Sequence, residues 1–136
     1  MNAALLAQIH SEAFTDSRAW TEQEFEALLT SDLCFLTGDS QGFALGRVIS
    51  DEVELLTLAV SPKYQSRGVG RQILGKFHSK ALHRGAKTAF LEVAKTNTRA
   101  INLYISNNYI QVGTRTAYYL LSDGRKVDAL ILSRPL

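Results

Sequence analysis

The segment VELLTLAVSPKYQSRGVGR, residues 53–71, carries the strongest structural signals in this chain. Residues 53–60 form a nearly continuous apolar run, which is typical of a central strand covered on both faces. Pro62 ends that strand, because proline has no N–H to donate to a ladder of hydrogen bonds. The glycine-rich residues that follow begin a helix, which we expect to run to about residue 84, where Gly85 ends it.

On both sides of this stretch, apolar spacing and turn residues predict further elements. Residues 21–24 (TEQE) form a capping box, which marks the start of a helix. Besides the two elements above, we predict helices over 3–13, 21–29 and 98–106, and strands over 33–37, 43–49, 88–94, 109–121 and 126–132. This order indicates a single α/β domain over residues 1–136, with a mixed sheet and helices on both faces.

Composition excludes several classes of protein. Of the 136 residues, 39 are Leu, Ile, Val or Phe, which is enough to build a core. The single cysteine, Cys34, excludes a disulfide framework and a multi-cysteine metal site, and the histidine spacing matches no metal set. No apolar run approaches the ~20 residues of a membrane span, and no signal peptide is recognisable. We therefore expect a cytoplasmic protein without a metal or membrane contact, with Cys34 in the core and with His10, His78 and His83 on the surface or at helix ends.

Charge is divided between the two halves of the chain. Residues 1–56 hold ten acidic and two basic side chains, whereas residues 57–136 hold three acidic and thirteen basic ones. This asymmetry predicts one cationic and one anionic partner. Nucleic acid is not the expected anion, because zinc-finger spacing, ribonucleoprotein motifs and heptads are all missing. Glu92 is the one acid between Glu54 and Asp123, and a solvated basic face does not explain its place between two apolar residues.

The segment Gln65–Arg71 has the chemistry of a phosphate-binding turn. Gly68 and Gly70 lack a Cβ, so an anion can approach the backbone N–H groups at the positive end of the following helix. Arg67 and Arg71 add two full charges. The segment is not a Walker loop, and it lacks the third glycine of a dinucleotide fingerprint. The alternative is a glycine-rich helix start that binds no ligand.

Further motifs accompany this turn: residues 56–62, the segment Leu91–Val93 with Asn97 and residues 100–104, and Tyr118-Tyr119 with residues 123–129. Together they resemble the GNAT superfamily of acetyl-CoA-dependent N-acetyltransferases, whose pyrophosphate loop reads Gln/Arg-x-x-Gly-x-Gly/Ala. Within it, they resemble the bacterial ribosomal-protein-alanine N-acetyltransferase subfamily. The resemblance covers about residues 53–134 and implies a mostly antiparallel central sheet. Asn108 departs from it by replacing a glycine, and residues 14–20 lack the Pro-Trp pair often found there.

The resemblance implies a reaction in which an acetyl group moves from acetyl-CoA to a primary amine and coenzyme A is released. It implies that Glu92 is the base near the amine and that Tyr104 is the acid near the leaving sulfur. It also implies that the backbone of residues 58–60 binds the pantetheine arm and polarises the thioester carbonyl. The full set of implied cofactor-binding residues is Leu58, Ala59, Val60, Gln65, Ser66, Arg67, Gly68, Val69, Gly70, Arg71, Asn97 and Tyr104. The purely structural alternatives are that Tyr104 is a core residue and that Glu92 forms a salt bridge to Lys95 or Arg99.

On the acceptor side, we expect Glu54 to contact the ammonium group, although a salt bridge at a strand edge is an equal alternative. Phe14, Trp20, Tyr118 and Tyr119 are candidates for a peptide groove, although buried aromatics of a mixed sheet would give the same pattern. Three hypotheses follow for the function. The acceptor is the N-terminal α-amine of a protein, or it is a small amine such as a polyamine or aminoglycoside, or the domain binds acyl-CoA without catalysis.

Overall fold

The computed structural model describes residues 1–136, and its elements follow the predicted order. The helices are α1 (Ala3–Ala13), α2 (Glu22–Leu29), α3 (Val69–His83) and α4 (Thr98–Ser106), with a short 3-10 turn η1 (Pro62–Tyr64). The strands are β1 (Cys34–Asp39), β2 (Gly42–Ile49), β3 (Glu52–Val60), β4 (Thr88–Ala94), β5 (Ile110–Leu120) and β6 (Lys126–Pro135). The turn η1 was not predicted; it forms because Pro62 ends the strand and fits the first position of a helical turn.

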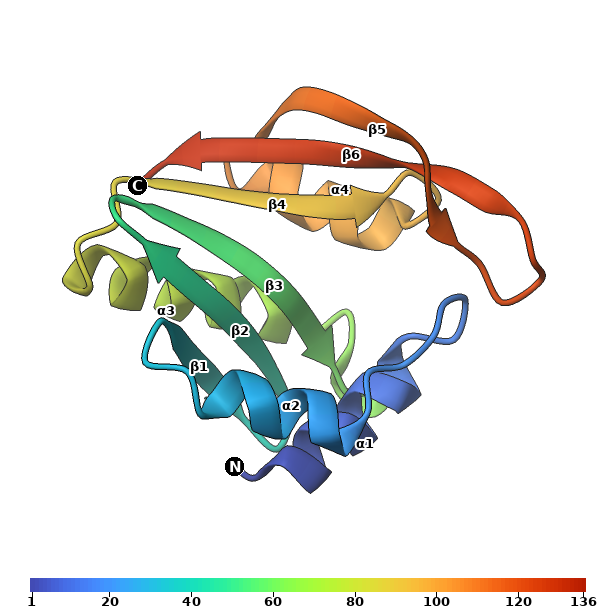
Figure 1. Cartoon of the computed structure of the whole chain (residues 1–136), viewed down its shortest axis with the longest axis horizontal. Helices are drawn as coiled ribbons and strands as arrows, with labels where there is room; N and C mark the ends of the chain where they lie inside the picture. Colours follow the sequence, from blue (N-terminus) through green and yellow to red (C-terminus); the bar gives the residue numbers. More distant parts are fainter.

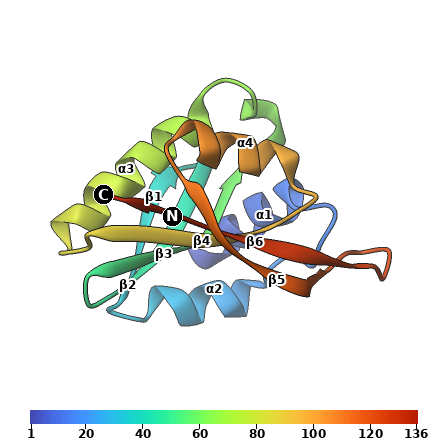
Figure 2. The ribbon, with the colours of Figure 1, turned by 90° about the horizontal axis from the view of Figure 1, so that it is seen from above.

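The six strands form one sheet in the order β1-β2-β3-β4-β6-β5. Only β3 and β4 pair in parallel, so the mostly antiparallel mixed sheet that the sequence predicted is confirmed. Figure 2 shows α3 and α4 on one side of the sheet and α2 on the other. None of the helices is both long and apolar enough to cross a bilayer.

Two apolar cores lie on the two faces of the sheet. The larger core packs α3, through Ile73, Leu74 and Phe77, against the sheet and α4. The smaller core packs α1 and α2 on the opposite face, where Leu6 and Phe25 are fully buried. Both faces of β1–β3 are therefore covered, as the apolar run of residues 53–60 predicted.

Candidate active site

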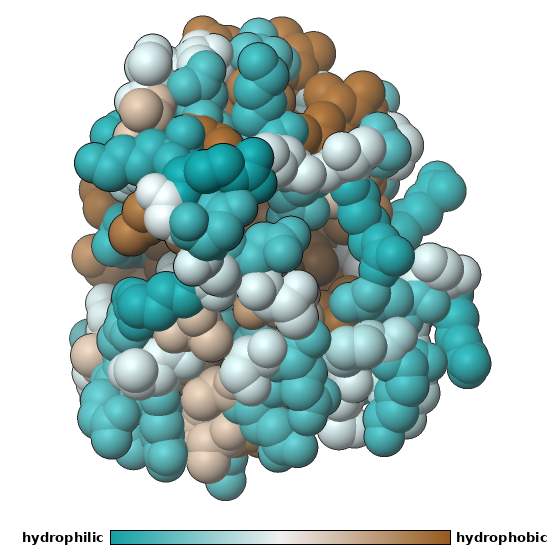
Figure 3. Space-filling view, turned by 90° about the vertical axis from the view of Figure 1, so that its right-hand side faces the viewer, coloured by the Kyte–Doolittle hydropathy of each residue, from teal (hydrophilic) through white to brown (hydrophobic).

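The sheet opens where β3 and β4 diverge. Their parallel pairing covers only Glu52 to Glu54 against Thr88 to Phe90, after which the strands continue separately to Val60 and Ala94. Figure 1 shows this divergence toward the right of the view. The space-filling view from that side shows a recess with hydrophobic atoms inside and hydrophilic residues around it (Figure 3). A ligand can thus enter the sheet between its two halves.

A cavity of about 510 Å³ lies at this opening. Its walls come from the end of β3, the turn before α3, the inner side of α4 and the end of α1. The predicted cofactor residues that line it are Leu58, Ala59, Val60, Gln65, Ser66, Gly68, Gly70, Arg71, Asn97 and Tyr104, together with the predicted groove residue Phe14. Arg67 and Val69 are not among the lining residues: Arg67 is exposed, and Val69 packs against the larger core.

A bulge in β3 directs the end of that strand into the cavity. Leu45 pairs with Thr57 and Gly46 pairs with Leu55, so Leu56 has no partner across the strand. The extra residue exchanges the two faces of the strand. Before the bulge, Leu55 faces the larger core, whereas after it Leu58 does so and Ala59 faces the smaller one. Glu54 and Leu58 consequently point to opposite faces.

The start of α3 offers free backbone donors to the cavity. Asn2, Thr21 and Asn97 cap the other three α-helices with side-chain oxygens, but Gly68, the residue before α3, gives no side-chain cap. Gly68 has a φ of 81°, a left-handed conformation that glycine adopts without strain. The first-turn N–H groups of this 15-residue helix therefore face the cavity without an internal partner. Such an end suits an anion, and Arg71 adds a full charge beside it.

Hydrogen bonds join the turn to the neighbouring walls. Gln65 donates from Nε2 to the carbonyl oxygen of Val60 at 2.9 Å, and its Oε1 accepts from Arg99 of α4. Asn97 accepts the Ala100 N–H through Oδ1 at 3.3 Å and so begins α4 at the rim. These contacts hold the turn between β3 and α4.

Tyr104 of α4 lies at the cavity and near Tyr119 of β5. It lines the cavity and is only 6% exposed, and burial raises the pKa of its phenol, so the group stays protonated at neutral pH. Its electrostatic neighbours include Tyr119 of β5, whose hydroxyl donates to the backbone oxygen of Glu92 at 3.3 Å. Tyr119 thus lies close both to Tyr104 and to Glu92.

Glu92 lies on the sheet face that β4 turns away from the larger core. Its side chain is 17% exposed, and Oε1 is 2.9 Å from Nε of Arg115. The partner is therefore neither Lys95 nor Arg99, the two that sequence proximity suggested. Sequence reasoning missed Arg115, because it lies 23 positions from Glu92 in the chain. The two residues meet because only β6 separates their strands, β4 and β5, in the sheet.

A second carboxylate, Glu54, lies on the same face. Its Oε1 accepts from Arg47 Nη2 at 2.9 Å, so the strand-edge salt bridge that was one of its two interpretations is present. Burial raises the pKa of Tyr119, and the charges of Glu92 and then Glu54 raise it further. Both carboxylates therefore lie near one phenol. Tyr118 is exposed, with its ring set edge-on to that of Tyr119 at a centroid distance of 5.6 Å.

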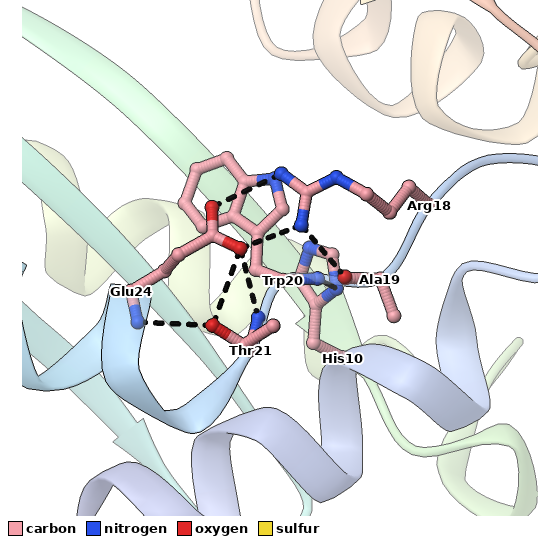
Figure 4. Close-up of polar contacts among 6 residues, drawn as sticks. All are labelled: His10, Arg18, Ala19, Trp20, Thr21 and Glu24. Atoms are coloured by element: carbon pink, nitrogen blue, oxygen red, sulfur yellow. Dashed lines mark hydrogen bonds and ion pairs between the residues drawn. The ribbon is translucent and has the colours of Figure 1, made fainter.

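The loop between α1 and α2 borders this face. Ser17 forms an isolated bridge with Leu121, and the Ser122 N–H donates to the Asp16 carbonyl at 2.8 Å. These contacts join the loop to the end of the β5–β6 hairpin. Figure 4 shows how the loop itself is held: Arg18 binds both oxygens of Glu24, at 2.5 and 3.0 Å.

His10 anchors the same loop from beneath, contrary to the expectation that it is a surface or capping residue. It is 2% exposed, because Phe14 and Trp20 stack on its ring at 4.3 and 5.3 Å. Its Nδ1 accepts the Trp20 backbone N–H at 3.2 Å (Figure 4). Trp20 accordingly supports the loop and is not among the residues that line the cavity.

The two inner histidines give a testable pH dependence of stability. Burial lowers the pKa of His10 to about 4 and that of His78, which bonds Tyr109, also to about 4. As the pH falls below ~6.5, the unfolded chain takes up these protons first, so the stabilisation is complete above that pH and is lost toward pH 4. The free energy of unfolding should fall by up to ~1.4 kcal/mol per pH unit for His10 and by less for His78, which is only partly buried and therefore partly screened by solvent.

Urea unfolding of the wild type and of His10→Phe between pH 7 and 4.5 measures this slope. The phenyl ring keeps the stacking but binds no proton, so the variant should lose a smaller part of its stability over this range. The same slope in both proteins would show that His10 titrates normally.

Comparisons with known proteins agree with the fold. The model of the Acetyltransferase (GNAT) family matches residues 3–107. The [ribosomal protein bS18]-alanine N-acetyltransferase of Escherichia coli (strain K12) is 35% identical over 97% of this chain and 91% of its own length.

Solved structures show the same likeness. The crystal structure of the ribosomal-protein-alanine N-acetyltransferase from Escherichia coli superposes with a TM-score of 0.86 at 31% identity, covering 98% of this chain and 86% of that one. The fold also matches that of Arabidopsis thaliana NAA60 in complex with acetyl-CoA, with a TM-score of 0.82 at 18% identity over 99% of this chain and 93% of that one.

Proposed function

Because the chain belongs to the acetyltransferase (GNAT) family and is an acetyl-CoA-dependent N-acyltransferase, we propose that its acceptor is the α-amine of a protein that begins with alanine. The observation that carries the proposal is the junction of two sites at one opening of the sheet. The cavity reaches the opening from the side of α3 and α4, and the carboxylates of Glu54 and Glu92 lie on the other face. The similar enzyme from Escherichia coli is named for alanine of ribosomal protein bS18.

The residues present fit acetyl-CoA. The uncapped first turn of α3, with Gly68, Gly70 and Arg71, would bind the diphosphate through backbone N–H groups and one guanidinium. The backbone of Leu58 to Val60 would bind the pantetheine arm and donate to the thioester oxygen. When bound, acetyl-CoA supplies an acyl group that is activated toward an amine.

Two side chains then handle the protons. Glu92 accepts a proton from the ammonium group of the acceptor, which leaves a neutral amine as the nucleophile. Tyr104 donates its phenolic proton toward the departing sulfur, since burial keeps that proton in place at neutral pH. Tyr119 holds the backbone of Glu92 and contributes, with Glu54, to the pocket for the ammonium.

The acceptor peptide would lie between the α1–α2 loop and the β5–β6 hairpin. Phe14 and Tyr118 would border its first residues, and Trp20 would support the loop from inside. The α-amine suits this mechanism better than a lysine amine. With a pKa of ~7.7–8.0, a larger fraction of it is already neutral at physiological pH than of a lysine amine, whose pKa is ~10.4. A ribosomal-protein acceptor would place the reaction in the cytoplasm.

The test is an acceptor screen read by mass spectrometry. Hexapeptides that begin with each of the common amino acids are incubated with the protein and acetyl-CoA, beside spermidine as a small amine. We expect one acetyl group on the α-amine of the alanine peptide. Acetylation of spermidine alone would contradict the proposed acceptor.

The diphosphate site is tested by Gly70→Val. An added Cβ at Gly70 meets Leu103 Cδ2 at 3.4 Å and Val60 Cγ2 at 3.7 Å, so a valine would project into the cavity between these walls. We expect KM for acetyl-CoA to rise by on the order of tenfold, because one good contact is worth about that factor. Steady-state kinetics at varied acetyl-CoA concentration measure it.

Gly75→Val is the matched control. It makes the same change in the same helix, at a position where nothing lies within 4 Å of an added Cβ. Its KM for acetyl-CoA should equal that of the wild type. An equal rise in both variants would place the effect in α3 as a whole and would contradict the proposed diphosphate site.

A further inference from the structure

Arg115 covers the solvent side of the proposed base. Its Nε is 2.9 Å from Glu92 Oε1, and its side chain is 53% exposed, whereas that of Glu92 is 17% exposed. In the sheet, Arg115 lies opposite Ala129 of β6, which in turn pairs with Ala94 of β4. The guanidinium therefore reaches over β6 to the carboxylate from the open face of the sheet. An acceptor amine that arrives from this face meets the guanidinium first.

Arg115 is held more loosely than the arginine that fixes the α1–α2 loop. Arg18 binds two oxygens of Glu24 and also donates to the Ala19 carbonyl. The guanidinium of Arg115 has one ion pair, and its other contact is the exposed ring of Tyr118, 5.1 Å away. The pair is half-exposed on the arginine side, so water and salt screen part of its attraction. Glu92 is mostly buried, so the guanidinium leaves it at little cost only when another cation takes its place.

The backbone beside Arg115 is irregular in a way that aims its side chain. The register between β5 and β6 breaks between Arg115 and Tyr119, and Ala117 has a φ of 50° within that break. The Ala117 N–H donates to Asp128 Oδ1 at 2.9 Å, which holds the bulge against β6. Bulges of this kind redirect a neighbouring side chain and are frequent beside active sites. The irregularity therefore places Arg115 over Glu92.

Two cations then compete for one carboxylate. The ammonium group of an acceptor and the guanidinium of Arg115 repel each other when both approach Glu92. Resting on the proposed role of Glu92 as the base, we propose that Arg115 is an exchangeable counterion, which holds Glu92 in the free enzyme and is replaced by the acceptor ammonium.

The return of Arg115 to Glu92 after the reaction is favoured, because the acceptor is a cation and the acetylated product is neutral at the same nitrogen. The ammonium N–H bond breaks and a carboxyl O–H bond forms on Glu92, while Arg115 keeps all its protons throughout. The acetylated product is a neutral amide, which does not compete for the carboxylate once Glu92 has released its proton to water. Arg115 then returns to Glu92. It thus acts as a positioning and specificity residue that separates free from acetylated amino termini.

The experiment measures binding, so it does not depend on turnover. Calorimetry gives the Kd of two peptides for the coenzyme A complex: a hexapeptide with an N-terminal alanine, and the same peptide with its amino terminus acetylated. In Arg115→Gln the free-amine peptide should bind about three- to fivefold more tightly than in the wild type, which is the size expected for removal of a weak ion pair. The acetylated peptide should bind as before.

Two variants complete the test. Arg115→Lys restores the competing charge, so its affinity for the free-amine peptide should return to that of the wild type. Lys76→Gln removes one charge from the exposed face of α3 and should change neither Kd. Unchanged or weaker binding of the free-amine peptide to Arg115→Gln, or equal tightening of both peptides, would overturn the exchange.

These measurements distinguish a failure of the proposed exchange from a failure of the proposed acceptor. If the wild type acetylates no alanine peptide, the acceptor is wrong, and the same comparison is made with a small monoamine, n-butylamine, and its N-acetyl derivative. These two molecules differ by one ammonium group, which the amide lacks. Tightening of n-butylamine alone in Arg115→Gln would support the exchange, and equal effects on both would overturn it.

Discussion

Glu92→Gln is expected to lower kcat/KM for the acceptor by ~10²–10⁴-fold, the usual contribution of a positioned general base. Glutamine keeps the size of the side chain but cannot take a proton from the ammonium group. The loss should be greatest at lower pH, where more of the α-amine is protonated. Initial rates between pH 6.5 and 9 measure it.

Binding of acetyl-CoA should be unaffected by this change, because Glu92 is not among the residues that line the cavity. A thermal shift with coenzyme A verifies this point. Glu52→Gln is the control, since it removes an exposed carboxylate of β3 outside the proposed site. Full activity of Glu92→Gln would exclude Glu92 as the base.

Tyr104→Phe is expected to lower kcat by at least ~10²-fold, because it removes the proposed general acid. The phenyl ring keeps the packing against Tyr109, whose ring meets that of Tyr104 edge-on at 5.7 Å. KM for acetyl-CoA should stay near its original value, since the change removes a proton donor and not the wall of the cavity. Steady-state kinetics with the acceptor peptide at saturation measure the loss.

Tyr109→Phe is the matched control for this variant. Its phenol is also buried, but the hydroxyl bonds His78 Nε2 at 2.8 Å and the residue does not line the cavity. It should lose ~1 kcal/mol of stability with its hydrogen bond and keep its kcat. Equal losses of kcat in the two variants would show that packing of the tyrosine pair, and not the proton of Tyr104, supports the rate.

The helices and strands could be predicted because the residues that begin, fill and end each of them are neighbours in the sequence. The apolar run of residues 53–60, its end at Pro62 and the glycine-rich start of α3 all lie within one stretch of sequence. The alternation Leu91-Glu92-Val93 likewise places Glu92 on the face opposite the larger core, since Leu91 and Val93 are both buried in that core. The positions of these residues could be predicted without knowing which distant residues pack against them.

The pairing of the charged residues was not predictable, because it depends on how the strands are ordered and where they bulge. Arg115 reaches Glu92 only because β6 inserts between β4 and β5. Arg47 reaches Glu54 because these two residues oppose each other across β2 and β3. The bulge at Leu56 has no signal in an apolar run, yet it decides which side chains of β3 face the cavity.

His10 was misplaced for a related reason. Its position on α1 beside polar residues suggests exposure, and only the return of the loop brings Phe14 and Trp20 onto its ring. Aromatic residues of a loop carry no periodic signal that would show where they pack. The loop contacts on which the acceptor side depends could therefore be seen only in the folded structure.

In the mechanism we propose, the start of α3 holds the diphosphate of acetyl-CoA and thereby places the acyl group between Tyr104 and Glu92. The decisive test is a crystal structure with a bisubstrate ligand, in which an alanine peptide is joined to coenzyme A through an acetyl link. We expect phosphate oxygens on the N–H groups of residues 69–71, and the linked amine between the Tyr104 hydroxyl and the Glu92 carboxylate. A diphosphate bound away from α3, or a Glu92 side chain turned from the amine toward solvent, would contradict it.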